Sequence, residues 1–500
     1  MRSSALRWWP AWLLVAGGLL ALGTRFLDRA QVSYVLDEPQ LQDAAVRDAQ
    51  AGRWASISVL RGTRGVRYGP VPLWFYTAVH RVAGPRPEAG ILAAGLFLTG
   101  AMVLLSVVLG RRSEAPPPVI AAALWLAAAS PFAFVWSRQA WDNTLLAGFA
   151  GLVVAALARP GPVRAGAAVL AGVLLGLALG THLLALPLVL AVVLVLLTEP
   201  RSGRDRLTTL AALLLAAAVV LLPYARALLD EPSVYAVAPA AGLGPRLARA
   251  LTGLAAPFIQ TAGIGLDYFF SPEWAAFVGS RFMGRALRWA GPPLAALVAG
   301  VALLGLVLGR RSASPALRRV ARLGLWTWVL HAAFLGALAL PSEPHYEQPV
   351  LWIPVAGWAL AVATLWPARN RAAQVLVALA LGVGLWGVAV QRAWMGWIAE
   401  NGGTRGIYYG LTLGAQRQAL AEACAGAPTA WIALQTRVVV FPQSLRSLAH
   451  TEPACRERRV EVCGPLCPPA PPGWTVMTVR YAGRGARLAP VQAQGQPSSR

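Results

Sequence analysis

The sequence of 500 residues lacks lysine entirely, and only 13% of its residues are charged. A soluble domain is usually about 25% charged. Acidic residues are absent from every long apolar run, and cysteine is absent before residue 424. These absences argue against a chain of several soluble domains, because soluble helices show a polar face every three to four residues.

The sequence has a series of apolar runs instead. A helix of about 20 apolar residues spans the roughly 30 Å of hydrocarbon in a bilayer. We therefore predict an all-α polytopic membrane protein with about eleven transmembrane helices, at 8–24, 91–110, 119–136, 144–158, 165–181, 183–198, 207–223, 293–309, 323–340, 349–366 and 372–390. The first run could alternatively be a cleaved signal peptide, but it is long for one and no clear cleavage site follows it.

Arginine is distributed unequally between the two sides that these spans define. Basic residues near span ends favour the cytoplasm. With the N-terminus inside, the cytoplasmic segments hold Arg2, Arg7, Arg111, Arg112, Arg159, Arg164, Arg201, Arg204, Arg206, Arg310, Arg311, Arg318, Arg319, Arg322, Arg369 and Arg371. We predict a multi-pass protein of the plasma (inner) membrane with a cytoplasmic N-terminus and an extracytoplasmic C-terminal domain. The net charge of +23 then needs no nucleic-acid partner.

The polar segments predict two domains. Residues 1–390 form the transmembrane domain, with an outer loop at 28–90 and a second at 225–291. Residues 391–500 form a small α/β domain with disorder after about 488. Within that domain we expect a helix at Ala415–Cys424 and strands at Trp431–Phe441 and Thr475–Tyr481. In the first loop, the apolar stretch Pro72–Arg81 is too short to span and suits a helix lying at the membrane surface.

All four cysteines lie in the C-terminal domain, which the predicted topology places outside the cytoplasm, where disulfides persist. Cys424, Cys455, Cys463 and Cys467 allow three pairings, between which the sequence does not choose. A zinc site is poorly supported, because Cys463 and Cys467 have no second such pair and only His450 is near. We predict no metal site.

The acidic pair Asp37-Glu38 is the first candidate for chemistry. It lies shortly after the first span, between the apolar Tyr34-Val35-Leu36 and a helical stretch, so it could be ordinary solvated surface. Held near a membrane surface, such a carboxylate is partly desolvated and can act as a base. The outer end of the third span carries Arg138 and Asp142, whose spacing predicts one helix face. They form either a simple ion pair or a site for an anionic headgroup.

Other polar residues fall on the same predicted side. Arg61, Arg64 and Arg67 precede Tyr68 in a loop, where arginines suit phosphate or merely attract lipid headgroups. His182 lies between the fifth and sixth spans, and His345-Tyr346 precedes the tenth. A histidine at a helix boundary is more often structural than functional.

In these elements the chain resembles the GT-C polytopic glycosyltransferases, in the branch of the protein O-mannosyltransferases and bacterial lipid A aminoarabinose transferases (glycosyltransferase family 39-like). The resemblance covers about residues 8–390. It is carried by the acidic pair Asp37-Glu38, by Tyr68-Gly69-Pro70-Val71-Pro72-Leu73-Trp74, by Ser137-Arg138-Gln139-Ala140-Trp141-Asp142, and by His182 and His345-Tyr346-Glu347-Gln348-Pro349. The chain departs from the family at one position. Family members often carry a lysine just before the Pro-x-Pro-Leu region, near where this chain has Gly69, so Arg67 has to substitute for that lysine.

The resemblance implies a GT-C fold and an enzyme that moves a sugar from a polyprenyl-phosphate carrier to an extracytoplasmic lipid, glycan or protein, with inversion. It implies Asp37 and Glu38 as catalytic residues, and Arg67, Tyr68, Arg138, Asp142, His182, His345 and Tyr346 as donor or acceptor contacts. No cofactor is implied with confidence, although some GT-C relatives use a divalent metal. A flippase for lipid-linked sugars and a catalytically degenerate scaffold are the alternatives. Transport sites usually lie at mid-depth, and no predicted span has an ionisable residue there, His331 being the nearest candidate. This argues against the flippase.

Overall fold

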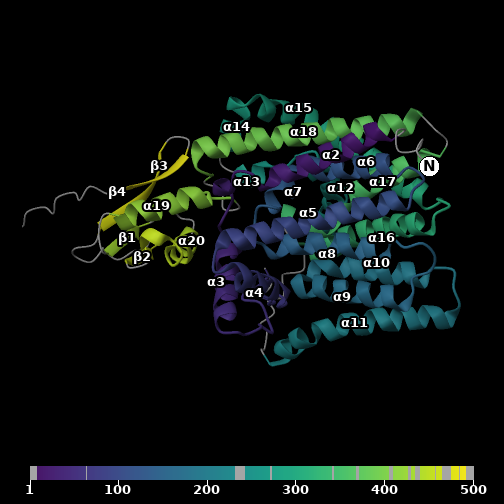
Figure 1. Cartoon of the computed structure of the whole chain (residues 1–500), viewed down its shortest axis with the longest axis horizontal. Coiled ribbons are helices and arrows are strands. Elements are labelled where there is room, and N and C mark those ends of the chain that lie inside the picture. Colours follow the sequence, from purple (N-terminus) through teal and green to yellow (C-terminus); the bar gives the residue numbers. More distant parts are fainter. Residues whose placement is uncertain are drawn as a thin grey trace, which may run out of the picture.

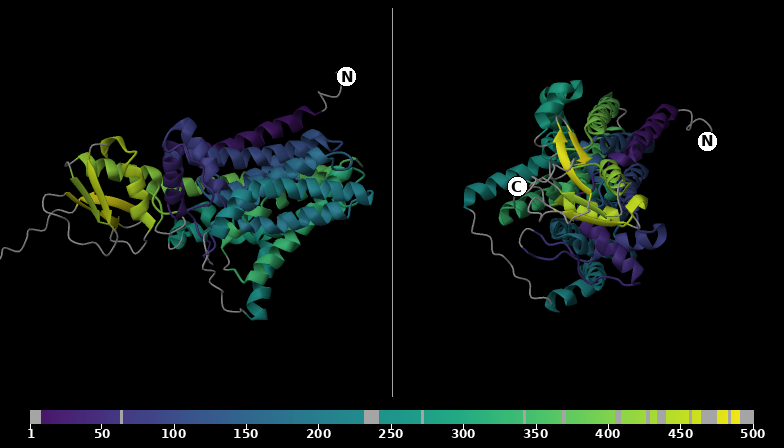
Figure 2. Two further views of the ribbon diagram at one scale, coloured as in Figure 1. Left: turned by 90° about the horizontal axis from the view of Figure 1, so that it is seen from below. Right: turned by 90° about the vertical axis from the view of Figure 1, so that its left-hand side faces the viewer.

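The protein is a long helical bundle with a small mixed domain at one end (Figures 1 and 2). The computed structural model describes residues 8–62, 65–230, 242–270, 273–340, 343–367, 371–404, 409–425, 429–433, 440–455, 458–463, 475–482 and 485–490. The start of α2 and the C-terminal domain lie at opposite ends of the bundle (Figure 1), as an odd number of crossings requires.

Seven helical segments are long and apolar enough to cross a membrane. They are α2 (Trp9–Gly23) with its extension η1 (Thr24–Phe26), α5 (Pro87–Arg111), α11 (Gly203–Asp230), α15 (Phe282–Gly309), α16 (Pro315–Leu338), η4 (Pro344–Val350) with α17 (Trp352–Leu365), and α18 (Arg371–Asn401). Exposed apolar side chains such as Leu215 on α11, 67% exposed, suit contact with lipid. The chain is a multi-pass membrane protein.

Four shorter apolar helices coincide with the other four predicted spans. They are α6 (Pro116–Ala129), α8 (Asp142–Leu157), α9 (Ala165–Thr181), and η3 (Leu183–Ala185) with α10 (Leu186–Leu197). The predicted third span is interrupted, because Ser130 takes an extended conformation before the short helix α7 (Pro131–Trp136). Proline disfavours a helical residue before it, which accounts for the break.

The two loops predicted to lie outside are largely helical in their described residues. The first holds η2 (Arg29–Gln31), α3 (Asp37–Gln50) and α4 (Val71–Ala83), and α4 confirms the predicted short amphipathic helix. The second, predicted at 225–291, is also mostly helical in its described residues. Helix α11 continues to Asp230, α12 (Leu243–Thr261), α13 (Asp267–Phe270) and α14 (Trp274–Ser280) follow, and α15 begins at Phe282. The domain boundary predicted at 390 falls inside α18.

The C-terminal domain is a four-stranded sheet with helices. It comprises α19 (Leu413–Ala425), β1 (Thr429–Ala433), α20 (Val440–Ala449), η5 (Pro453–Cys455), β2 (Arg459–Cys463), β3 (Thr475–Ala482) and β4 (Gly485–Pro490). The strand order is β2-β1-β3-β4; β1 runs parallel to β2 and β3, and β4 is antiparallel to β3. The helix predicted at 415–424 and the strand predicted at 475–481 are confirmed.

Two predictions for this domain need correction. The strand predicted at 431–441 ends at Ala433, and Val440 begins α20, whose Leu445 and Leu448 are buried at helical spacing. The disorder predicted after about 488 begins too early, because β4 continues to Pro490 and pairs with β3. Residues 491–500 lie outside the described residues.

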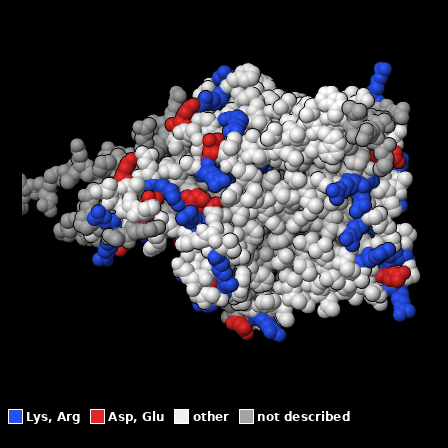
Figure 3. Space-filling view, viewed as in Figure 1, with Lys and Arg blue, Asp and Glu red and all other residues white. Residues whose placement is uncertain are grey.

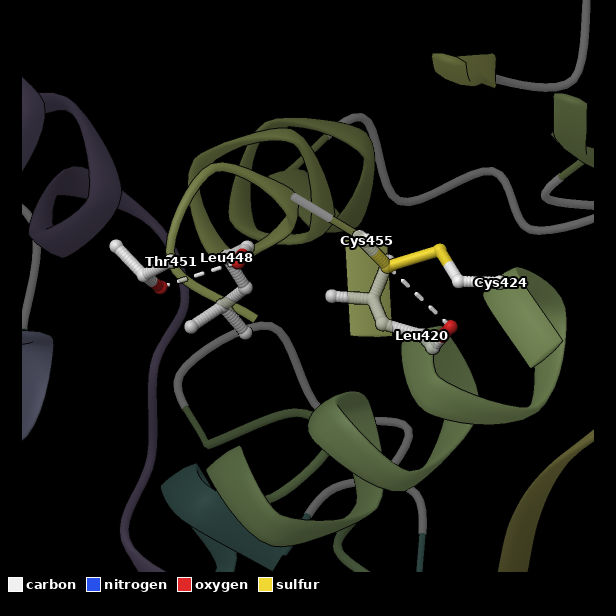
Figure 4. Close-up of a disulfide and its surroundings, with 5 residues drawn as sticks. All are labelled: Leu420, Cys424, Leu448, Thr451 and Cys455. Carbon is white, nitrogen blue, oxygen red and sulfur yellow. Dashed lines mark hydrogen bonds between the residues drawn. A yellow bond between two sulfur atoms is a disulfide. The ribbon is translucent and has the colours of Figure 1, made fainter. Parts of the chain in front are cut away.

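A disulfide joins Cys424 at the end of α19 to Cys455 in η5 (Figure 4). It is one of the pairings that the sequence left open. The sulfur of Cys455 also lies against the carbonyl of Leu420. The bridge therefore fixes the segment after α20 to α19. Cys467 lies outside the described residues.

Candidate functional site

The candidate site lies where the start of α3 meets the start of α8, the end of α9 and η4. Helix α3 begins at Asp37, directly after Leu36, which has a φ of 57°. A positive φ is rare for leucine and costs on the order of 1–3 kcal/mol. The strained turn aims the first helical turn, with its two carboxylates, at the bundle.

The carboxylate of Glu38 is buried and that of Asp37 is partly buried, and the segment before α8 holds both. The indole Nε1 of Trp141 donates to Oδ2 of Asp37 at 3.3 Å, and the amide of Ala140 donates to Oε2 of Glu38 at 3.4 Å. Burial raises the pKa of Asp37, and the Trp141 bond partly opposes that rise. Burial also raises the pKa of Glu38 well above its ordinary value. Both groups are thus more basic than ordinary carboxylates.

Asp142 is a third carboxylate at this end of the bundle. It is 1% exposed, and its Oδ1 accepts from the amide of Asn143 at 2.8 Å. Its Oδ2 is buried without a hydrogen-bond partner, and Asp142 interacts electrostatically with Asp37. Within the described residues Asp37, Glu38 and Asp142 have no ion-pair partner. A buried carboxylate without a cation is costly, so this arrangement suits a positively charged or proton-donating ligand.

Aromatic rings and histidines complete the site. Tyr68 stacks on His182 with ring centroids 4.3 Å apart, and His345 lies 5.0 Å from the Trp141 ring and 4.3 Å from the Tyr346 ring. The hydroxyl of Tyr268 lies 3.1 Å from Nδ1 of His345. Tyr68, His182, His345 and Tyr346, all predicted as contacts, therefore share one region with Asp37 and Asp142.

His182 is neutral and has an unused donor. Burial lowers its pKa to about 3. Its Nδ1 accepts from the amide of Leu184 at 3.1 Å, so the ring proton sits on Nε2. That Nε2 is buried without a hydrogen-bond partner. It can donate to a substrate oxygen.

Arg138 does not join the site, and the predicted helix face shared with Asp142 is wrong. Helix α7 ends at Trp136 and α8 begins at Asp142, so a turn separates the two residues. The Nη atoms of Arg138 donate to the carbonyls of Arg25 (2.8 Å), Leu27 (2.6 Å) and Asp28 (2.7 Å). Arg138 therefore holds the segment that leads from α2 toward α3.

The loop before α4 brings Arg67 and Tyr68 beside α9. Arg67 forms an isolated antiparallel β-bridge with Arg61, and the carbonyl of Arg67 accepts a hydrogen bond from the hydroxyl of Tyr224 at 2.6 Å. Arg64 lies outside the described residues. Gly69 packs so closely on Gly180 that a Cβ there would collide with the Gly180 backbone. The glycine at the position near the family's lysine is thus a packing requirement of this chain.

Sequence reasoning missed a buried charged group that borders the site. Glu347 accepts from Arg249 of α12 at 3.0 Å and lies 3.1 Å from Nε2 of His331. Glu347 belongs to the helical segment Pro344–Leu365, just before the predicted span 349–366. Arg249 interacts electrostatically with His345. The only sequence signal was the Glu343–Glu347 pair around His345, because Arg249 comes from a distant segment.

Among the described residues, no group of three or more His, Cys, Asp or Glu side chains is arranged to hold a metal ion.

Comparisons with known proteins give one family match and several fold matches. Residues 67–226 match the family model described as dolichyl-phosphate-mannose-protein mannosyltransferase. That segment contains Tyr68, Asp142 and His182. No curated protein sequence matches the chain significantly.

The fold resembles that of ArnT from Cupriavidus metallidurans. The apo structure matches with a TM-score of 0.51 at 15% identity, over 92% of this chain and 90% of ArnT. ArnT bound to undecaprenyl phosphate matches with a TM-score of 0.50 at 14% identity, over 90% and 89% of the two chains. The family model covers residues 67–226 of this chain, and the two ArnT structures show that the chain shares their overall fold.

Proposed function

We propose that the protein transfers a sugar from a polyprenyl-phosphate carrier to a hydroxyl or amine acceptor outside the cytoplasm, with inversion at the anomeric carbon. The donor class is inferred from the family match and from the undecaprenyl phosphate bound to ArnT. The observation that carries the proposal is the partly buried Asp37, whose pKa is raised by desolvation. The acceptor remains a lipid, a glycan or a protein.

Asp37 acts in this proposal as the general base. It removes the acceptor proton while the acceptor oxygen or nitrogen attacks the anomeric carbon and the carrier phosphate leaves. A base works best when its pKa lies near the operating pH, and burial moves Asp37 in that direction. Glu38 is the less accessible acid, 2% exposed, and supports the start of α3.

The remaining contacts are assigned by their chemistry. Asp142 lies in electrostatic reach of Asp37 and orients the acceptor or the sugar. The Nε2 proton of His182 donates to a sugar or phosphate oxygen. Arg249, which faces His345, and Arg67 supply positive charge for the leaving phosphate. Such stabilisation acts where charge develops in the transition state.

The test is a transfer assay on the purified chain with a panel of polyprenyl-phosphate sugars. Asp37→Asn keeps the shape and removes the base, so turnover should fall by about 10²–10⁴. Glu38→Gln should cost less. Asp48→Asn is the matched control, because Asp48 lies on the same helix and pairs with the exposed Arg53.

Three outcomes are informative. If Asp37→Asn is nearly normal while Glu38→Gln is inactive, the two acids exchange roles. If both variants are fully active, the mechanism placed on α3 is wrong. Movement of the intact donor across the membrane of vesicles that contain the protein, without cleavage of the donor, supports the flippase instead.

A further inference from the structure

A second charged site lies at the end of the bundle opposite Asp37. Helix α8 has Asp142 at one end, and the carbonyl of Leu157 at the other end accepts from Nη1 of Arg319 at 2.8 Å. Sixteen residues at 1.5 Å each separate the two ends by about 24 Å. This approaches the hydrocarbon thickness of a bilayer, so the two sites border opposite membrane surfaces.

Arg319 is the fixed centre of this second site. Its guanidinium donates to the carbonyls of Leu157, Arg159 (3.1 Å) and Gly161 (2.8 Å) and forms an ion pair with Glu199. Glu199 is also bound by Arg201. One buried carboxylate therefore serves two guanidinium groups.

A pocket of ≈ 230 Å³ opens beside this cluster. We call it the basic pocket; its charged lining is Glu199, Arg201, Arg318, Arg319 and Arg322, and its remaining lining is Gly161, Val195 and three prolines. Four guanidinium groups against one carboxylate leave an excess of three positive charges. So many cations in one pocket repel one another unless an anion joins them.

Three of these arginines have donors to spare. The Nε of Arg201 is buried without a hydrogen-bond partner. Arg318 donates only to the carbonyls of Ser312 (2.5 Å) and Ala313 (3.0 Å), and Arg322 has no hydrogen bond or ion pair within the described residues. Buried donors are nearly always satisfied, so a missing acceptor is indicated.

We propose that the basic pocket binds the phosphate headgroup of an anionic membrane phospholipid. Arginine presents a planar set of donors that fits phosphate oxygens, and basic pockets between transmembrane helices suit such headgroups. The source is a membrane lipid rather than a soluble phosphate because apolar surface adjoins the pocket. Val195 lines it, and Leu197 and Leu207, at the neighbouring ends of α10 and α11, are 44% and 70% exposed and offer contact to acyl chains.

Charge also gathers at this end of the molecule as a whole. Figure 3 shows blue side chains clustered at the right-hand end, separated from the charges on the left by a broad band nearly free of charge. An uncharged band between two charged rims is the surface expected of a protein embedded in a bilayer. The basic pocket thus lies at the level of lipid headgroups.

The experiment uses the purified full chain in an uncharged detergent, with two readouts. The thermal midpoint is followed while phosphatidylglycerol, phosphatidylcholine or glycerol phosphate is added, and native mass spectrometry counts bound lipid. Phosphatidylglycerol should raise the midpoint in a saturable way, since a ligand of the folded state stabilises it. Phosphatidylcholine and glycerol phosphate should not.

Arg322→Gln removes a cation without breaking a bond within the described part of the protein. It should weaken phosphatidylglycerol binding by at least about tenfold, the smallest effect expected for hydrogen bonds to a charged group. Arg310→Gln, at the same end but outside the pocket lining, is the matched control and should bind normally. Equal responses to both phospholipids, or equal binding by the two variants, overturn the proposal. An equal response to glycerol phosphate overturns the lipid assignment and makes this a soluble-anion site.

Discussion

The two ends of the helical bundle differ in how their buried and partly buried carboxylates are paired. At one end, Glu199 forms ion pairs with both Arg201 and Arg319. At the other, Asp37, Glu38 and Asp142 have no ion-pair partner within the described residues, and one oxygen of Asp142 has no hydrogen bond at all. The charge of Glu199 is therefore balanced within the protein. The carboxylates at the other end keep their charge and basicity available to a ligand.

This difference separates groups that hold the fold from groups that perform chemistry. Breaking a buried ion pair is strongly destabilising because it leaves an uncompensated charge. Neutralising an unpaired buried carboxylate removes a cost. Glu347 lies between these cases: it is paired with Arg249 and His331, yet it borders the candidate site.

Glu199→Gln should give the largest loss of stability. The substitution leaves Arg201 and Arg319 buried without their carboxylate, and such changes cost about 3–5 kcal/mol. Thermal unfolding in detergent measures the effect. The comparison becomes sharper with Asp142→Asn, which should leave the midpoint unchanged or raise it while reducing turnover. A drop in midpoint for Asp142→Asn as large as that for Glu199→Gln would contradict the proposed difference between the two ends of the bundle.

Opening the disulfide should act on the C-terminal domain alone. Cys424 and Cys455 are 31 residues apart, and a bridge of this size typically contributes about 2–4 kcal/mol. The paired variants Cys424→Ser and Cys455→Ser should become sensitive to protease between α19 and β2, whereas the bundle should stay resistant. Proteolysis of the bundle at the same protease concentration would show that the bridge supports more than this domain.

Gly69→Ala should perturb the site through packing. A methyl group there meets the backbone of Gly180, and overpacking of this kind costs about 1–3 kcal/mol. Gly100→Ala, where a Cβ meets nothing within 4 Å, is the control. Turnover and thermal midpoint of the two variants should therefore diverge. Identical behaviour would show that the loop before α4 shifts to accommodate the methyl group without affecting turnover or stability.

Trp141→Phe should give the smallest change, a shift of the pH profile. The base must be deprotonated to act, so turnover rises with pH through the pKa of Asp37, which burial has raised. The Trp141 bond lowers that pKa, and its removal raises the pKa further. The acid limb of the profile should move to higher pH. A limb that moves to lower pH, or not at all, means that the limb does not report Asp37.

Local sequence determined the spans but not the charged contacts. Each apolar run except the third, which breaks at Ser130, became one helical segment, because burying apolar surface in lipid needs only length and composition. The acidic pair on α3 could be singled out since two acids after a span stand out locally. The Arg249–Glu347 and Arg319–Glu199 pairs join residues 98 and 120 positions apart, so local pattern could not reveal them.

Arg138 shows the opposite failure. Its spacing from Asp142 is correct for one helix face, but the helical run ends between them and the side chain turns toward Arg25 and Asp28. Spacing predicts a shared face only where the helix is continuous. Carbonyl partners supplied by a distant segment decided where this arginine lies.

The most direct test measures turnover and thermal midpoint on the same preparations of Asp37→Asn and Glu199→Gln. We predict that Asp37→Asn loses about 10²–10⁴ in turnover with an unchanged midpoint. Glu199→Gln should have a lower midpoint but keep near-normal turnover per folded molecule below its transition. Near-normal turnover for Asp37→Asn, or an inactive Glu199→Gln with an unchanged midpoint, would contradict the division between the two ends.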